Sequence, residues 1–171
     1  QGYIQTTPIQ LCLMTAQIAN GGYKIYPKIV LKKYDEDLKE DKFQPLVKNS
    51  KNIKIVQEAM FSSTNEVRGT SYRSRIDDPK YQFAGKTGTA QVKRITKQDR
   101  ELDLKTIEIP YEERDHALYV AYGPYRNPRY AVSILVEHGG SGSSIAAPIA
   151  KKLFKKIIDR HQIRKDFNSK K

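Results

Sequence analysis

The sequence predicts an α+β fold in which an antiparallel sheet is flanked by helices. The strand prediction depends on two apolar runs, residues 117–122 and 130–136, which are joined by Gly-Pro and Asn-Pro steps typical of a hairpin turn. The helix prediction depends on residues 7–20, 50–61 and 144–160, which carry helix-start signals or apolar residues at helical spacing. A further strand is expected around residues 83–92.

The first helix is strongly specified. Thr7 is a suitable N-cap, Pro8 fits the first helical position and Gln10 closes a capping box, whereas Gly21-Gly22 ends the helix. Apolar residues cover nearly its whole circumference, and such a helix belongs deep inside a protein. The other residues supply too few partners to surround it, so we expect the chain to be part of a longer protein.

The remaining segments follow in order. Residues 23–34 are expected to be extended, 35–45 to be a charged connector and 62–79 a polar loop. Residues 93–114 form a long charged stretch, which we expect to be a mobile loop with some helix. The last helix should turn its lysines to water and bury one aliphatic stripe, which consists of Ile145, Ile149, Leu153, Ile157 and Ile158.

The composition suits a single domain of 171 residues, which we place at residues 1–162, followed by a disordered basic tail at residues 163–171. The net charge of +12 fits a solvated lysine surface, but also a nucleic-acid, anionic-lipid or acidic-polymer partner. Cys12 lies in an apolar run and is expected to be a buried thiol. The three histidines lack metal-ligand spacing, so we expect neither a metal nor a cofactor.

The stretch from Phe83 to Val92 combines a strand pattern with a polar centre, Gly85-Lys86-Thr87-Gly88-Thr89. Glycine inside a strand often marks the close approach of a ligand or of another backbone. The stretch supplies a cation and two hydroxyls, and an edge strand would add unpaired N–H and C=O groups for an extended peptide. This combination predicts a site for a peptide-like ligand that ends in a carboxylate, although a polar turn is an alternative interpretation of the triplet.

The order of these elements resembles the C-terminal half of a class B penicillin-binding transpeptidase domain, most like the elongation-specific member, penicillin-binding protein 2. The Lys-Thr-Gly triplet is a signature of that fold, which serine β-lactamases share. The resemblance covers most of the chain and is carried by Gly2-Tyr3 with Thr7-Pro8-Ile9-Gln10, Ala19-Asn20-Gly21-Gly22, Gly69-Thr70, Lys86-Thr87-Gly88, Arg114-Asp115-His116 and Ala121-Tyr122-Gly123-Pro124.

This resemblance implies an enzyme that cross-links peptidoglycan by serine acyl transfer from a D-Ala-D-Ala stem peptide, and that β-lactams inhibit. Lys86 would anchor the substrate carboxylate and assist proton transfer, and the Thr87 and Thr89 hydroxyls would bind that carboxylate. Gly88 would let the ligand lie against the strand, and the Thr89 N–H would be one donor of the oxyanion hole. Gly69 and Thr70 are possible cleft-lining residues.

The chain departs from the family pattern in one major respect, because it contains no Ser-x-x-Lys motif. A Ser-x-Asn match at Ser63-Thr64-Asn65 follows the second predicted helix, and we interpret it as a helix-ending turn. We therefore expect the nucleophile and the general base to lie upstream, so the segment alone should be inactive. His116 is expected to be structural, because the base in this family is a lysine.

The resemblance also implies a place on the periplasmic face of the bacterial inner membrane, with an N-terminal anchor and partners in the elongation complex. A β-lactamase or a β-lactam sensor domain of the same fold remains an alternative, although the long stretch after the Lys-Thr-Gly strand argues against a β-lactamase. From another class, a basic nucleic-acid-binding module would explain the net charge. That module would need lysines gathered on one face, and only the last helix offers them.

Overall fold

The computed structural model describes residues 4–29, 32–33, 36–37, 44–93 and 104–168. Its centre is a three-stranded antiparallel sheet in the order β3-β4-β5, formed by β3 (Ala84–Ala90), β4 (His116–Gly123) and β5 (Tyr130–Val136). Gly88 of β3 is opposite Leu118 of β4, and Leu118 is opposite Leu135 of β5. The predicted hairpin is confirmed, and β4 is longer by one residue at each end than the sequence predicts.

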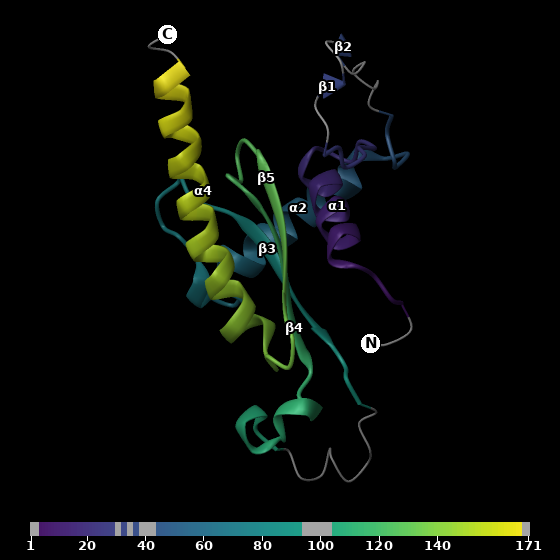
Figure 1. Cartoon of the computed structure of the whole chain (residues 1–171), viewed down its shortest axis with the longest axis vertical. Helices are drawn as coiled ribbons and strands as arrows, with labels where there is room; N and C mark the ends of the chain where they lie inside the picture. The colour runs from purple at the N-terminus through teal and green to yellow at the C-terminus, as the bar shows by residue number, and fades with distance from the viewer. Residues whose placement is uncertain (1–3, 30–31, 34–35, 38–43, 94–103, 169–171) are drawn as a thin grey trace.

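Helices cover both faces of this sheet, which gives the predicted α+β architecture (Figure 1). Helix α4 (Ala147–Asn168) lies on one face, over a core that contains Phe83, Tyr119 and Phe154. Helices α1 (Pro8–Ala19) and α2 (Ser50–Asn65) lie on the other face, over a smaller core around Met60 and Tyr122. Side chains alternate between the faces of a strand, so neighbouring residues of β3 belong to different cores.

Helix α1 begins as predicted, because the Thr7 side chain accepts from the Gln10 N–H and the Thr7 N–H donates to Gln10 Oε1. Within the described residues α1 is covered on one side only, as expected if the rest of the chain supplies too few partners to surround it. Only Thr15 is fully buried on α1, since the helix packs on β5 with one side and exposes Ile9 on another. Cys12 is half-buried rather than buried, and its thiol contacts Ala131 O at 3.4 Å, while burial raises its pKa.

Helix α2 is longer than predicted and ends at Asn65 instead of near residue 61. Ser, Thr and Asn have weak helix propensity, which favoured a turn at this point. The structure instead gives these residues tertiary partners, since Asn65 Nδ2 donates to Phe83 O on β3 at 3.0 Å. Hydrogen bonds to the neighbouring strand therefore extend the helix through Ser63-Thr64-Asn65.

Helix α4 corrects the predicted buried stripe. Ile145, Ile149 and Leu153 are 40%, 43% and 36% exposed, so three members of that stripe face outward. The buried face is one residue out of phase and consists of Ala146, Ala147, Ala150, Phe154 and Ile158. Small alanine side chains let the helix approach the sheet closely, and the Phe154 ring stacks on Phe83 with 5.0 Å between ring centroids.

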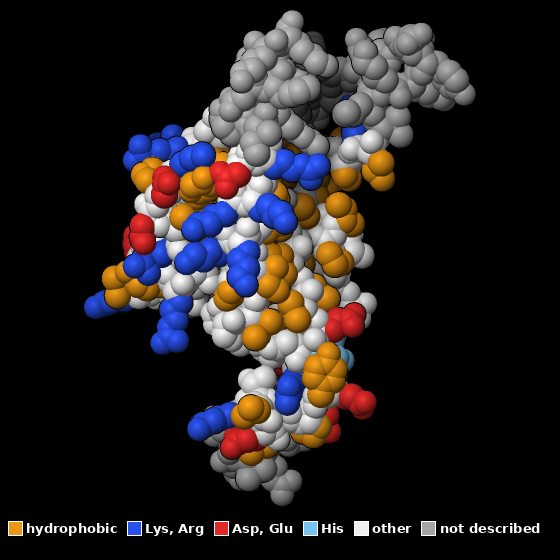
Figure 2. Space-filling model, turned by 60° about the vertical axis from the view of Figure 1, so that its left-hand side comes forward, with side chains coloured by type: hydrophobic (Ala, Val, Ile, Leu, Met, Phe, Trp, Pro, Cys, Tyr) orange, Lys and Arg blue, Asp and Glu red, His pale blue; other side chains and the backbone are white. Residues whose placement is uncertain are grey.

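A π-helical turn, η4 (Gly142–Ala146), leads into α4, which continues to Asn168. The chain is therefore helical over residues 163–168, where the sequence predicts a disordered tail. The lysines of α4 face water as predicted, with Lys152, Lys155 and Lys156 exposed. Figure 2 shows Lys and Arg side chains gathered on the face that it brings forward, with hydrophobic side chains between them.

The other segments are short. Tyr23 bridges to Pro45, and β1 (Lys32–Lys33) pairs with β2 (Glu36–Asp37) in a small ribbon. The stretch from 93 to 114 holds two turns of 3₁₀ helix, at Thr106–Glu108 and Tyr111–Glu113, and its residues 94–103 lie outside the described part. Within the described residues, none of the helices has the length and apolar character that a membrane span requires.

Candidate active-site strand and cleft

Strand β3 lies at an edge of the sheet, because it pairs with β4 on one side only. In an antiparallel pair, the N–H and C=O of one residue point to the same side, and that side alternates along the strand. Three carbonyls of β3 and its approach accept side-chain hydrogen bonds rather than ladder bonds: Phe83 O from Asn65, Gly85 O from Thr64 at 3.5 Å and Thr87 O from Lys86. These odd-numbered residues, and Thr89 with them, therefore direct their backbone groups toward the free edge.

The end of α2 covers only part of that edge. Asn65 and Thr64 occupy the carbonyls of Phe83 and Gly85, which lie at the start of the strand. Among the described residues, no element is paired with the edge from Thr87 onward. The backbone N–H of Thr89, which the sequence analysis assigns to an oxyanion hole, therefore lies on the open part of the strand.

Lys86 is exposed and stands on the α1–α2 face of the sheet. Its Nζ donates to Thr87 O at 2.9 Å and to Thr87 Oγ1 at 3.2 Å. An ammonium group has three N–H donors, so these two bonds leave one N–H for a further acceptor. A carboxylate beside this group would gain a charge-assisted hydrogen bond.

At Gly88, one face of the sheet is open and the other is covered. A Cβ on Gly88 would meet only Leu118 Cβ, at 3.3 Å, on the face that carries Lys86. The opposite face is covered by Gly142, where a Cβ would lie 2.4 Å from Leu118 O and 2.8 Å from Gly88 O. The absence of side chains at both glycines lets η4 lie directly on the strand and leaves the Lys86 side open.

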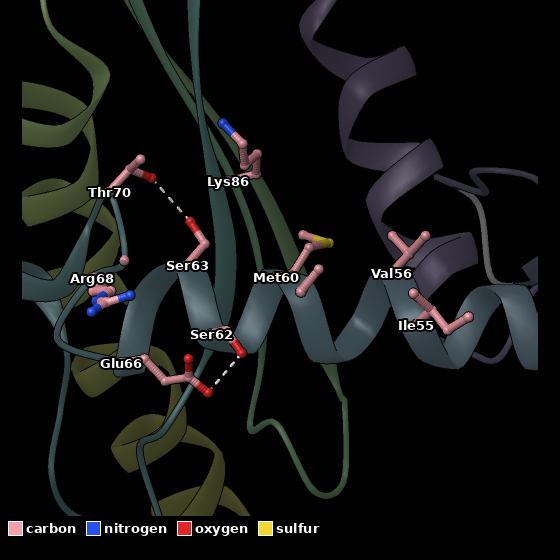
Figure 3. A pocket seen from close by; sticks show the side chains of 11 residues that line it. Ile55, Val56, Met60, Ser62, Ser63, Glu66, Arg68, Thr70 and Lys86 are labelled. Atoms are coloured by element: carbon pink, nitrogen blue, oxygen red, sulfur yellow. Dashed lines mark hydrogen bonds between the residues drawn. The ribbon is translucent and has the colours of Figure 1, made fainter.

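A pocket of about 520 Å³ lies between Lys86 and α2 (Figure 3). Its floor is apolar and consists of Ile55, Val56, Ala59 and Met60 from α2. Its polar rim consists of Ser62, Ser63, Glu66, Arg68, Gly69, Thr70 and Lys86. Of the residues singled out in the sequence, Lys86, Gly69 and Thr70 thus line one cavity, whereas Thr87, Gly88 and Thr89 are outside its lining.

Thr87 is nevertheless joined to the pocket rim. Its Oγ1 lies 3.4 Å from Thr70 Oγ1, which in turn lies 3.1 Å from Ser63 Oγ. Gly69 makes this arrangement possible, because a Cβ there would lie 2.4 Å from Ser63 O and 2.5 Å from Ser62 O. The sequence drew attention to Ser63 only through the Ser-x-Asn match at Ser63-Thr64-Asn65, which was interpreted as a helix-ending turn, so its contact with Thr70 was not predicted.

A buried group of hydroxyls supports the site from beneath. Tyr119 is fully buried, and its Oη lies 2.9 Å from Thr64 Oγ1 and 3.0 Å from Ser71 Oγ. Burial raises the pKa of the Tyr119 hydroxyl, so it stays neutral. A Cβ on Gly85 would lie 2.3 Å from Tyr119 Oη, which explains why glycine precedes Lys86. One tyrosine thus packs under α2, the residue 69–71 loop and the strand.

His116 lies away from this group, at the end of β4 opposite Ala90. Its Nδ1 accepts the backbone N–H of His138 at 2.9 Å, and the two imidazole rings have centroids 4.8 Å apart. His138 is itself held by a contact between its Nδ1 and Arg114 O at 3.1 Å. These contacts fit the structural role that the sequence analysis gives to His116.

Residues 1–155 match the penicillin binding protein transpeptidase domain family. Among curated relatives, the peptidoglycan D,D-transpeptidase MrdA of Haemophilus influenzae is 33% identical over 159 residues, which cover 90% of this chain and 24% of that protein. The MrdA of Salmonella typhimurium strain LT2 is 31% identical over 93% of this chain and 26% of its own length. The chain thus spans about a quarter of the length of these relatives.

Solved structures agree with these sequence matches. The crystal structure of Pseudomonas aeruginosa PBP2 in complex with WCK 5153 superimposes with a TM-score of 0.71 at 34% identity, over 91% of this chain and 31% of that one. PBP2 of Helicobacter pylori, in its complex with MreC, gives a TM-score of 0.72 at 28% identity, over 93% of this chain and 26% of that one. On the evidence of its sequence and its fold, the chain belongs to the penicillin-binding protein transpeptidase domain family, with relatives of the PBP2 type.

Proposed function

We propose that residues 1–162 are the C-terminal portion of a peptidoglycan D,D-transpeptidase that acts in cell-wall elongation. The observation that carries this proposal is the open edge of β3 at Thr87 and Thr89, next to the exposed ammonium of Lys86. An edge strand binds an extended peptide through its backbone groups, and a nearby cation selects a peptide that ends in a carboxylate. The D-Ala-D-Ala end of a stem peptide has both properties.

In the proposed reaction, a serine alcohol attacks the carbonyl between the two D-alanines and forms a tetrahedral oxyanion. The C–N bond then breaks, the terminal D-alanine leaves with a proton on its amine, and the acyl-enzyme is resolved by the amine of a second stem peptide. The Thr89 N–H would donate to the oxyanion, and loss of one such donor typically costs about 10²–10³ in rate. Lys86 and Thr87 would hold the carboxylate of the leaving D-alanine.

We do not expect this chain to contain the attacking serine, because it has no Ser-x-x-Lys motif. The apolar surface on the α1–α2 side supports a further part of the domain packing there. Ile9 and Met14 of α1 and Ile55 of α2 are exposed, and the floor of the cavity beside Lys86 is apolar. We propose that a segment with the nucleophile and the Ser-x-Asn motif covers these residues and completes the cleft.

The proposed ligands and partners follow from the relatives. Penicillin-binding protein A of Mycobacterium tuberculosis, 26% identical, has been solved as an imipenem acyl-enzyme, which supports β-lactams as ligands of the complete domain. The complex of Helicobacter pylori PBP2 with MreC supports a partner from the elongation complex. Such an enzyme would work on the periplasmic face of the inner membrane, where its substrate is located.

A fluorescent penicillin tests this proposal. We expect the complete transpeptidase that carries this chain to be labelled covalently, and the label to be lost after competition with unlabelled imipenem. The chain of 171 residues alone should remain unlabelled. Labelling of the isolated chain would disprove the proposal that the attacking serine lies outside it. Failure to label the complete protein would disprove the proposed transpeptidase function.

A further inference from the structure

Three hydroxyl groups link the end of α2 to the Lys-Thr-Gly strand. Ser63 Oγ lies 3.1 Å from Thr70 Oγ1, Thr70 Oγ1 lies 3.4 Å from Thr87 Oγ1, and Lys86 Nζ donates to Thr87 Oγ1 at 3.2 Å. Figure 3 shows Ser63 and Thr70 pointing toward one another at the rim of the cavity, with Lys86 on the other side of Ser63 from Glu66 and level with Thr70. We call Ser63, Thr70 and Thr87 the hydroxyl chain.

The backbone around the middle member of the hydroxyl chain is held in place. The residues on both sides of Thr70 are packed against the last turn of α2: Gly69 lies on the backbone of Ser63, and Ser71 donates to Ser63 O from its N–H and its Oγ, both at 3.0 Å. Ser71 also contacts the buried Tyr119 hydroxyl at 3.0 Å. The backbone at Thr70 is therefore held against α2, and the exposed Thr70 hydroxyl contacts Ser63 and Thr87.

The Lys86 ammonium fixes the direction of one bond in this group, whereas either partner can donate in the two hydroxyl–hydroxyl contacts. An ammonium can only donate, so Thr87 Oγ1 accepts from Lys86. The Thr87 hydroxyl still has its own proton, which it can donate to Thr70, and Thr70 can donate to Ser63. Successive hydrogen bonds of this kind polarise one another, so the acceptor for the Lys86 ammonium is strengthened by groups that do not touch it.

We propose that Ser63 and Thr70 are positioning residues, which hold Thr87 in one χ1 rotamer and thereby keep its hydroxyl on the Lys86 ammonium at the open edge of β3. A threonine side chain has three staggered χ1 positions, which its backbone restricts and which contacts with neighbours restrict further. Neither Ser63 nor Thr70 needs to touch the ligand for this purpose. The consequence for acylation depends on the proposed function, whereas the rotamer itself does not.

The rotamer is tested by NMR on the complete transpeptidase with isotope-labelled threonine. Three-bond couplings from the Thr87 γ-carbon to its backbone nitrogen and carbonyl report χ1, and we expect one rotamer in the native protein and averaged couplings in Thr70→Val and Ser63→Ala. Thr70→Ser restores the hydroxyl and should restore the single rotamer. Ser50→Ala is the matched control, because Ser50 is an exposed serine of the same helix that lies outside the cavity lining. Unchanged Thr87 couplings in folded Thr70→Val and Ser63→Ala would overturn the proposal.

A second experiment measures the acylation rate of the complete transpeptidase with fluorescent penicillin. Loss of one net hydrogen bond corresponds to about a twofold to tenfold lower second-order rate constant in Thr70→Val and Ser63→Ala. Ser50→Ala, outside the cavity lining, should match the native protein, and Thr70→Ser should recover most of the rate. A labelled native protein with unchanged Thr70→Val and Ser63→Ala rates would overturn the positioning role in catalysis, whereas a native protein that is not labelled would overturn the proposed function instead.

Discussion

Two tyrosines of β4 provide a matched pair for a stability experiment. Tyr119 and Tyr122 are 0% and 1% exposed, so both hydroxyls are removed from water. Tyr119 Oη lies within hydrogen-bond distance of Thr64 and Ser71, whereas Tyr122 Oη has no partner among the described residues. Replacement by phenylalanine removes the hydroxyl and leaves the ring, so the two variants differ mainly in the hydrogen bonds they lose.

The change in the free energy of unfolding depends on which hydrogen-bond partners remain after each substitution. In Tyr119→Phe, Thr64 Oγ1 still has Met60 O at 3.3 Å and Ser71 Oγ still has Ser63 O at 3.0 Å, so neither group is orphaned. Two net hydrogen bonds are then lost, which lowers the free energy of unfolding by about 1–2 kcal/mol. In Tyr122→Phe, a buried hydroxyl without a partner disappears, so the same free energy should stay unchanged or rise by up to about 1 kcal/mol.

Thermal unfolding followed by circular dichroism measures this difference. For a chain of this size, the midpoint of Tyr119→Phe should fall by about 2–8 °C, and that of Tyr122→Phe should not fall. Equal slopes in urea unfolding would show that the two variants differ in stability and not in compactness. Equal midpoints for the two variants, or a larger loss in Tyr122→Phe, would refute the hydrogen-bond argument.

Three further predictions concern the site and α4. In the complete transpeptidase, Lys86→Ala should lower the acylation rate by about 10²-fold or more, as measured with fluorescent penicillin, and an unchanged rate would exclude Lys86 from the site. Gly85→Ala should lower the unfolding midpoint, because its Cβ would lie 2.3 Å from a buried hydroxyl, whereas Gly88→Ala should keep the midpoint and lose acylation. The opposite ranking of the two glycine variants would contradict this geometry. Hydrogen bonds from Tyr81 and Lys80 hold the pKa of the exposed Asp159 below its ordinary value. Asp159 therefore stabilises the fold above the pKa that it has in the unfolded chain, and this contribution is lost as pH falls through its lower folded-state pKa. NMR titration of Asp159 in Tyr81→Phe should show the pKa rising toward its ordinary value, and no change would argue against that hydrogen bond.

The sequence predicted the parts of the fold that depend on local chemistry. The capping box at Thr7 and Gln10 places the start of α1, and the β-branched run at residues 130–136 matches β5 in full. The position of the Lys-Thr-Gly strand at a sheet edge was also predicted. With Gly85 and Gly88 in its centre, this strand offers few side chains for packing inside a sheet. These features depend on residues close together in the sequence, so no knowledge of tertiary contacts was needed.

The errors lie where distant residues decide the outcome. In α4, the stripe with Ile149 and the stripe with Ala150 and Phe154 are both helical patterns one residue apart. Hydrophobicity favoured the aliphatic stripe, but close packing against Phe83 selected the alanine face. The length of α2 was underestimated because the acceptor for Asn65 is a carbonyl of β3, far along the chain.

The partial cover that α2 gives to β3 also limits what can add to the sheet. An exposed sheet edge is a general aggregation hazard, because any extended chain can pair with it. Here the carbonyls of Phe83, Gly85 and Thr87 already accept side-chain hydrogen bonds. Within β3, which ends at Ala90, the N–H of Thr87 and the backbone groups of Thr89 are therefore left for an added chain. Alternate residues of a strand are about 6.6–6.8 Å apart, close to the span of a dipeptide. Within the described strand, the open part of this edge therefore has about the length of a dipeptide.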